Sequence, residues 1–187
     1  INSTAPVVGL FDRIGSAASI SNLNLQDVSI SETSTTKTQL IGSLAGISDG
    51  AISNVHVSGA ETISATPTSD GPLVPGFIVS GGLVGLTTPT STILDSSSAV
   101  NISASGSAAN LPESFEQEMV GGLVGKNGGT VSGSSSSGAV NAESVTTYAG
   151  AIGGGLIGIN DGPGDNGSAT VAESFSTGSV SIVNGIG

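Results

Sequence analysis

The sequence predicts an all-β protein built as a parallel β-solenoid, in which short strands of successive repeats stack on one another. Two observations support this prediction. A glycine–leucine step recurs along the chain, and a second pattern with apolar residues or serine at alternate positions follows each step. Neither pattern could bury an apolar face alone, whereas stacked copies would form a continuous core.

The glycine–leucine step occurs five times, at intervals typical of repeat proteins. The copies are VGLFD at 8–12, GSLAG at 42–46, GGLVG at 81–85, GGLVG at 121–125 and GGLIG at 154–158. We expect a short strand at each step and then a tight turn, with glycine allowing the backbone to turn where repeats crowd together. The predicted organisation is one domain over residues 1–187, with about five coils that start near residues 8, 42, 81, 121 and 154.

A β-branched residue opens the second pattern in each repeat: Ile20, Ile52, Ile93, Val131 and Val171. Three and five positions later each repeat has an aliphatic residue or serine, and the position between them is mixed. This alternation is typical of a half-buried strand. We therefore expect Ser96, Ser134 and Ser174 to point inward and to bond a hydroxyl or carbonyl of the neighbouring coil. The apolar face is expected to continue at Val28, Val100, Val140 and Val180.

Charge and composition exclude several classes of partner. The formal net charge is −11 and the basic residues are Arg13, Lys37 and Lys126, so electrostatic repulsion opposes nucleic acid and anionic membranes. The sequence has no cysteine, which excludes disulfides and thiolate metal sites. No window is apolar enough for a membrane span, and the first residues lack the pattern of a signal peptide. A start at Ile1 is expected for a mature or excised chain.

Two local motifs allow a competing interpretation. GGLVGKNGGT resembles a phosphate-binding loop, but Lys126 is followed by Asn127 rather than serine or threonine, and a strand pattern follows instead of a helix. SGSSSSG alone is typical of a flexible linker. The same serine spacing in the third and fifth repeats favours a strand instead.

The sequence assigns no catalytic, cofactor-binding or metal-binding residues. The position two after each β-branched residue is held by Asn22, Asn54, Asp95, Gly133 and Glu173. Asp95 and Glu173 would then lie two coils apart, which is a poor arrangement for glycoside hydrolysis, and a solvated turn is the favoured interpretation. A solvated loop is expected for Glu113, Glu116 and Glu118. His56 is expected on an exposed strand face, without a nucleophile that the sequence singles out.

Two binding hypotheses remain open. Asp161, Asp165 and Asn166 could supply oxygen ligands to calcium at the insertion 163–169, although their spacing matches neither the EF-hand loop nor the glycine–aspartate nonapeptide. Sugar binding usually uses exposed aromatic rings, and the candidates are Phe77, Phe115, Tyr148 and Phe175.

The repeats resemble a known family. GGLVGKNGGTVSGSSSSGAV, and GGLIGIND with TVAESFSTGSVS, resemble the GLUG-motif repeat of bacterial and archaeal cell-surface proteins, including adhesins and the non-catalytic parts of some immunoglobulin-cleaving metallopeptidases. VGLFDRIGSAASISNLNLQDVSI resembles the variant that opens such arrays. The resemblance implies a secreted or surface-attached right-handed β-helix that serves as a stalk, spacer or adhesive surface, and it implies no catalytic residues. The chain departs from the pattern at Ser43, where other copies have glycine, and at the insertion 163–169.

The expected function is therefore a structural or adhesive segment of an extracellular surface protein or filament, without catalysis. The alternative is a β-helix that binds or cleaves polysaccharide. The last residues, SVSIVNGIG, lead toward another glycine–leucine step, and an uncapped solenoid exposes unpaired strand edges. We expect those edges to be covered by neighbouring repeats of a longer chain or by end-to-end stacking of copies. Host or matrix glycans are further candidate partners.

Overall fold

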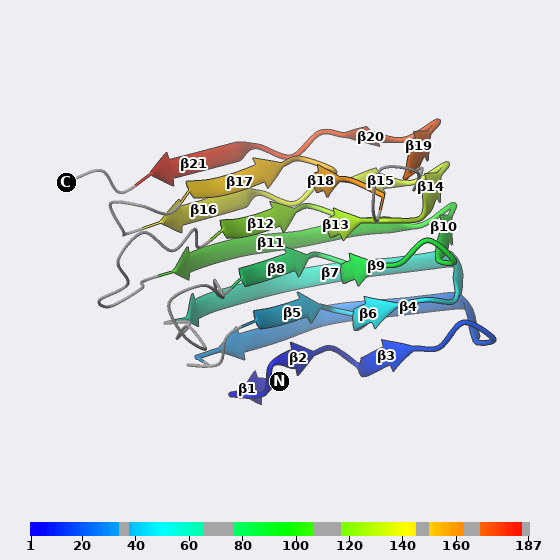
Figure 1. The fold of residues 1–187 in the computed structure, drawn as a ribbon, viewed down its shortest axis with the longest axis horizontal. Coiled ribbons are helices and arrows are strands. Elements are labelled where there is room, and N and C mark those ends of the chain that lie inside the picture. The colour runs from blue at the N-terminus through cyan, green and yellow to red at the C-terminus, as the bar shows by residue number, and fades with distance from the viewer. Residues whose placement is uncertain (34–37, 66–76, 107–116, 145–149, 163–168, 185–187) are drawn as a thin grey trace.

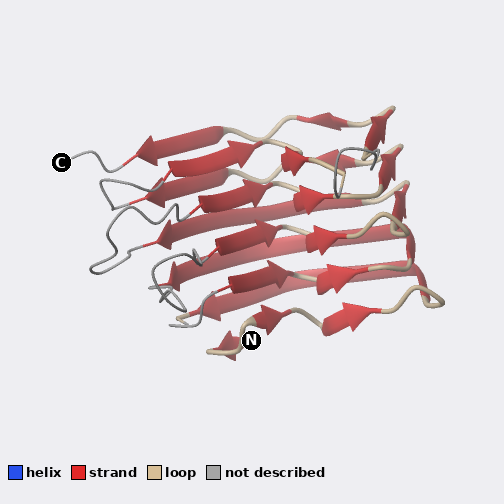
Figure 2. Ribbon diagram, viewed as in Figure 1, coloured by secondary structure: helices blue, strands red, loops and turns tan. Residues whose placement is uncertain are grey.

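The computed structural model describes residues 1–33, 38–65, 77–106, 117–144, 150–162 and 169–184, and these form three parallel β-sheets (Figure 1). Figure 2 shows strands and connecting loops, and no helix occurs in the described ranges. The prediction of an all-β fold with parallel pairing is confirmed. The three sheets are called A, B and C, and their strands are given below. The chain passes through sheet B, then sheet C, then sheet A, and repeats this order.

The strands of each sheet have the following bounds in the described residues. Sheet A contains β1 (Asn2–Ser3), β4 (Ser19–Glu32), β7 (Ala51–Ala65), β10 (Thr92–Leu94), β11 (Ser97–Gly106), β14 (Thr130–Ser132), β15 (Ser135–Ser136), β16 (Val140–Ser144), β19 (Thr170–Ala172), β20 (Phe175–Ser176) and β21 (Val180–Asn184). Sheet B contains β2 (Val7–Val8), β5 (Thr38–Gly42), β8 (Phe77–Gly81), β12 (Gln117–Gly121) and β17 (Gly150–Gly154). Sheet C contains β3 (Phe11–Ile14), β6 (Ala45–Ser48), β9 (Val84–Thr87), β13 (Val124–Asn127) and β18 (Ile157–Asn160).

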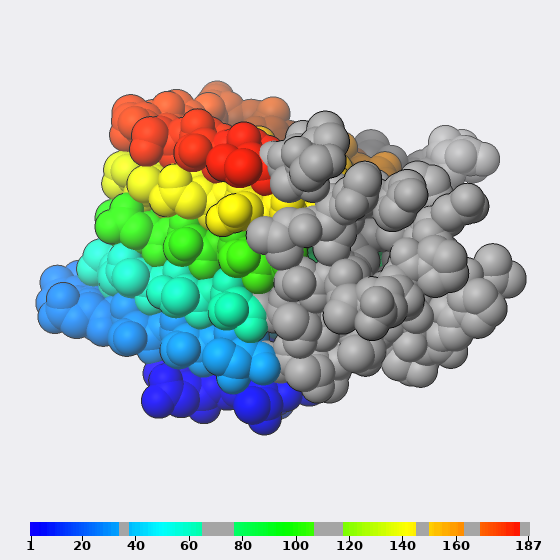
Figure 3. Space-filling view, turned by 90° about the vertical axis from the view of Figure 1, so that its left-hand side faces the viewer, coloured from blue at the N-terminus to red at the C-terminus, as the bar shows by residue number. Residues whose placement is uncertain are grey.

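Equivalent residues of successive repeats lie side by side. In sheet A, Ile93 is the register partner of both Ile52 and Val131, and all three side chains are fully buried. The repeats form layers that follow one another in chain order, which Figure 3 shows as colour bands from blue to red. Repetition in the sequence thus becomes a set of straight columns, and the inward columns form one continuous hydrophobic core.

The glycine–leucine step is a corner and not the strand that its apolar pattern predicts. In the second repeat, β5 ends at Gly42 and β6 begins at Ala45, with Leu44 buried at the bend between sheets B and C. A Cβ at Gly81, the register partner of Gly42, would overlap the carbonyl oxygen of Val84. Only glycine permits a turn this tight. The strands of sheet B, which precede each step, were not predicted.

The leucines of the step are buried in the middle layers and not at the ends. Leu44, Leu83 and Leu123 are fully buried. Leu156 is half-buried, and Leu10, in the first layer, is 52% exposed. The leucine of the step is therefore fully buried where a layer has neighbours on both sides.

The serine column points inward as predicted, with a different hydrogen-bond pattern. Ser96 and Ser134 are buried, and Ser174 in the last layer is half-buried. The backbone N–H of Ser96 donates to Ser134 Oγ at 3.1 Å, and that of Ser134 donates to Ser174 Oγ at 3.0 Å. Ser134 Oγ in turn donates to the carbonyl of Ser132. Each hydroxyl thus satisfies a backbone amide of the preceding layer rather than another hydroxyl.

The predicted valine column is split between two columns. Val28 and Val100 are register partners of Gly59, whereas Val140 is the partner of Ile102 and of Val180. A bulge between Leu25 and Val28 shifts β4 against β7. Gly59 has φ of 147° and a Cβ there would overlap the carbonyl of Val28, so the crowded column must contain glycine.

The polar column predicted as a solvated turn has a left-handed backbone in every repeat, inside the long strands β4 and β7 in the first two repeats and at bends between strands in the later ones. The residues have φ of 55° at Asn22, 52° at Asn54, 48° at Asp95, 59° at Gly133 and 51° at Glu173. This left-handed conformation is best tolerated by glycine and asparagine. The side-chain amide of Asn54 donates to Asn22 Oδ1 at 2.7 Å, which links two layers at this corner.

Candidate functional site

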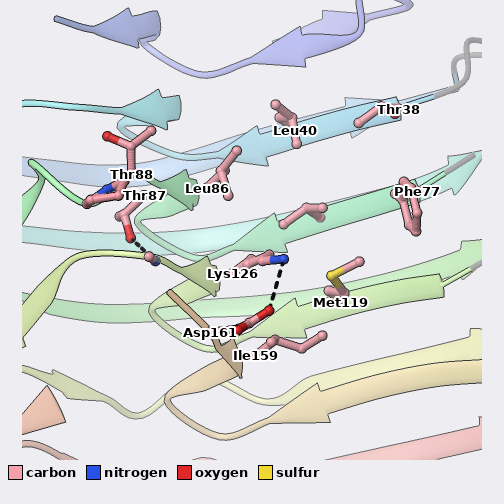
Figure 4. A pocket seen from close by; sticks show the side chains of 13 residues that line it. Thr38, Leu40, Phe77, Leu86, Thr87, Thr88, Met119, Lys126, Ile159 and Asp161 are labelled. Atoms are coloured by element: carbon pink, nitrogen blue, oxygen red, sulfur yellow. Dashed lines mark hydrogen bonds and ion pairs between the residues drawn. The ribbon is translucent and has the colours of Figure 1, made fainter. Parts of the chain in front are cut away.

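An apolar groove of about 570 Å³ lies on the outer face of sheets B and C (Figure 4). One wall consists of Leu40 on β5, Val79 on β8 and Met119 on β12, which are register partners. Strand alternation places these side chains outward, because their neighbours Ile41 and Val120 belong to the core.

The second wall comes from sheet C and contains the charged groups of the groove. Leu86 on β9, Lys126 on β13 and Ile159 on β18 are register partners. Lys126 Nζ lies 3.5 Å from a carboxylate oxygen of Asp161, which follows β18, and the Asp161 side chain is 62% exposed. An ion pair this exposed contributes at most about 1 kcal/mol, so both groups can be redirected to a ligand.

The groove resembles known ligand sites in its volume and in its lining. Its volume lies within the range of ligand sites, which are mostly apolar with a few polar groups. Phe77 and Thr38 line it beside the sheet B wall, and Thr87 and Thr88 line it beside sheet C. Among the described lining residues, Asp161 is the one acid. The described lining therefore contains one carboxylate, whereas glycoside hydrolysis uses a pair.

The central groove strands β12 and β13 belong to a recognisable repeat. The segment begins before β12, turns at the glycine–leucine step 121–125 and continues through β13, β14 and β15 into β16. Residues 116–141 match the family model of the GLUG motif. The predicted resemblance is confirmed for these residues. No curated protein and no solved structure matched the chain.

Outside the GLUG motif, the register of sheet A assembles a Ser–His–Asn cluster that sequence reasoning missed. His56 on β7 is the register partner of Ser97 on β11. His56 Nδ1 lies 2.8 Å from Ser97 Oγ, and Nε2 lies 3.0 Å from Asn54 Oδ1. Nothing in the sequence distinguishes Ser97 from the many other serines, and only the register of β7 against β11 identifies it.

The Ser–His–Asn cluster lacks the surroundings of an acyl-transfer site. His56 and Asn54 are exposed on the outer face of sheet A, as predicted for His56, and none of the three residues lines the groove. Nucleophilic catalysis needs a concave site and donors aimed at a developing oxyanion. The backbone amides of paired strands are already used by the ladder. The contact between His56 and Ser97 connects β7 to β11, and the contact between His56 and Asn54 lies within β7.

The acids of the predicted sites are dispersed. Asp95 and Glu173 occupy turns with Gly133 between them, as expected. Glu118, which lies within the GLUG motif, is 4% exposed on β12, so its prediction as part of a solvated loop is wrong. The reason is that β12 begins at Gln117, and alternation turns the next side chain inward. Glu113 and Glu116 lie outside the described residues.

The calcium and sugar hypotheses are only partly covered by the described residues. Asp161 is exposed and paired with Lys126, while Asp165 and Asn166 lie outside the described residues. Within the described ranges, no group of three or more His, Cys, Asp or Glu side chains could hold a metal ion. Phe175 is 62% exposed beyond the GLUG motif. Phe115 and Tyr148 are not described. The described part of the chain also has no helix that could cross a membrane.

Proposed function

We propose that the chain is a right-handed parallel β-solenoid of five coils that acts as a structural or adhesive segment of an extracellular surface protein or filament, rather than as an enzyme. The observation that carries this proposal is the in-register parallel pairing of equivalent residues through sheets A, B and C. The GLUG motif at 116–141 supports the same function. A rod whose layers must match one another offers rigidity and a repeating surface.

The two end layers support assembly through stacking. The first layer exposes Leu10 and Phe11, and the last layer exposes Phe175, Val180 and Val183. In the described residues, the strands of the last layer are paired on one side. Exposed strand edges with apolar side chains favour pairing with another chain. The proposed partners are therefore a second copy or a neighbouring repeat, stacked end to end.

End-to-end stacking predicts an oligomer whose size grows with protein concentration. Replacing Phe175 and Val180 with lysine should shift the chain to monomer, because charge on an exposed edge opposes strand pairing. Light scattering coupled to size-exclusion chromatography measures this. Leu94→Lys is the matched control, since Leu94 is 40% exposed but lies in a middle layer on β10. A wild-type protein that stays monomeric up to its solubility limit would contradict stacking.

The alternative function, polysaccharide binding, is supported by Phe77 in the groove, because sugar rings stack on aromatic side chains. Polysaccharide cleavage lacks paired acids among the described lining residues. If the groove binds glycans, Phe77→Ala should weaken binding about tenfold, equivalent to about 1.4 kcal/mol. Calorimetric titration with soluble polysaccharides measures this. Phe175→Ala is the control outside the groove, and equal losses in both variants would exclude the groove as the binding surface.

A further inference from the structure

Glu61 on β7 is buried in a column of aliphatic side chains. Its register partners are Ile30 on β4 and Ile102 on β11, and the next residue of the column is Val140 on β16. Glu61 is 1% exposed. A carboxyl in such a position is costly to ionise because the charge loses its hydration.

Two serines from the neighbouring elements contact this carboxyl. The hydroxyl of Ser43, at the corner after β5, donates to Oε1 at 3.0 Å, and the hydroxyl of Ser80 on β8 donates to Oε2 at 3.0 Å. The backbone N–H of Ser43 also bonds the carboxyl.

Both serines depart from the repeat. In the following layers the place of Ser43 is taken by Gly82, Gly122 and Gly155. Ser80 lies between Ile41 and Val120 in its column. Three polar residues therefore replace apolar or small ones where sheets A and B meet. Because each substitution alone would leave a buried polar group unsatisfied, their meeting at one point indicates a functional unit.

We propose that Glu61, Ser43 and Ser80 form a protonation-dependent latch between sheets A and B, which holds the layers tightly when the carboxyl is neutral and loosens them when it is ionised. This latch is independent of the function proposed above, because it rests on the buried cluster alone.

No charged side chain of the described residues compensates an ionised Glu61. On β4, which pairs with β7, the Asp27 side chain is exposed. Glu32 on the same strand pairs with Ile63, two residues further along than the pair Ile30–Glu61. His56 on β7 is exposed on the outer face of sheet A. Glu118 on β12 pairs with Ile78, and it lies two residues before Val120, which pairs with Ser80. Strands β5, β6, β8, β10 and β11 contain no titratable residue. The environment is therefore set by burial and by the serine hydroxyls.

Burial raises the pKa of Glu61 from its ordinary 4.5 to about 7, and the bonds from Ser43 and Ser80 offset part of this rise. The folded protein therefore holds the proton more tightly than the unfolded chain. The stabilisation is fully present below pH 4.5, declines as pH rises, and is lost above about pH 7. Across this window, ionisation of Glu61 should increase the equilibrium constant for unfolding about 300-fold. This is a factor of ten for each unit by which the pKa of Glu61 in the folded protein exceeds its ordinary value.

The test compares denaturant unfolding of wild type and Glu61→Gln between pH 4 and pH 9. Glutamine keeps the shape of the side chain without its charge. The ratio of the unfolding constants of wild type and Glu61→Gln should therefore increase about 300-fold from low to high pH, so that the variant is favoured at high pH. Glu32→Gln and Glu118→Gln identify contributions of the other buried acids. A difference that does not depend on pH would overturn the latch.

Direct titration keeps the proposal testable even if Glu61→Gln does not fold. Carbon-13 NMR of the Glu61 carboxyl in the wild-type protein should give a midpoint well above 4.5. Ser80→Val removes a donor to the ionised form and should raise this midpoint further, which a purely structural role of Ser80 would not do. A Glu61 midpoint at or below 4.5, or an unchanged midpoint in Ser80→Val, would overturn the proposal.

Discussion

Replacing Gly121 with alanine is expected to destabilise the protein by about 4 kcal/mol or more. Gly121 ends β12 at the corner between sheets B and C. A Cβ there would overlap the carbonyl oxygen of Val124 and lie 2.6 Å from the amide nitrogen of Gly158 in the next layer. Both atoms belong to backbone, so relief requires the movement of a paired strand rather than a side-chain rotation.

Gly150→Ala is the matched control for Gly121→Ala. Gly150 begins β17 in the same sheet, and nothing lies within 4 Å of a Cβ built there. The control should change stability by less than about 0.5 kcal/mol. Denaturant unfolding followed by circular dichroism measures both proteins. If Gly121→Ala were as stable as Gly150→Ala, the corner would be less crowded than the structure indicates.

Asn127→Leu is expected to cost about 3 kcal/mol, because a fully buried amide connects three layers. Asn127 Oδ1 accepts from Thr87 Oγ1 at 2.6 Å and from the backbone N–H of Gly129 at 3.2 Å. Its Nδ2 donates to Asn160 Oδ1 at 2.8 Å and to the Gly129 carbonyl at 3.2 Å. Leucine fills a similar volume but leaves these partners unsatisfied, and each costs about 1–3 kcal/mol when buried without a bond.

Two further variants separate lost hydrogen bonds from altered packing at Asn127. Asn160→Leu should cost less than about 1 kcal/mol, because Asn160 is exposed and water can replace its bonds. Adding Thr87→Val to Asn127→Leu should recover part of the loss, since it removes the unsatisfied hydroxyl. The free energies of unfolding form a double-mutant cycle. Purely additive effects would show that the Thr87–Asn127 bond contributes nothing.

The inward columns could be predicted because their residues are constrained by identical neighbours above and below. Ser134 illustrates this: its spacing from Val131 is repeated in other copies, and its burial is confirmed. The turn column through Asn54 and Gly133 was predictable for the same reason, since the same local conformation recurs in each layer.

The groove and the small clusters could not be predicted, because they depend on how different sheets meet. Met119 and Lys126 lie in different strands of one repeat, and only the bend at the glycine–leucine step makes them walls of one groove. His56 and Ser97 meet because the offset between β7 and β11 has one particular value. A bulge or a single inserted residue would have paired His56 with another residue.

The sequence by itself determined the all-β class, the parallel pairing of repeats and the inward position of the serines, because a periodic pattern has few ways to bury itself. The tertiary structure decided where departures from the repeat have consequences. Ser43 stands out in the sequence as a missing glycine, but its bond to Glu61 exists only because the corner after β5 packs against β7. Contacts between sheets join residues that no single period relates, and the groove and the buried carboxyl both arise there.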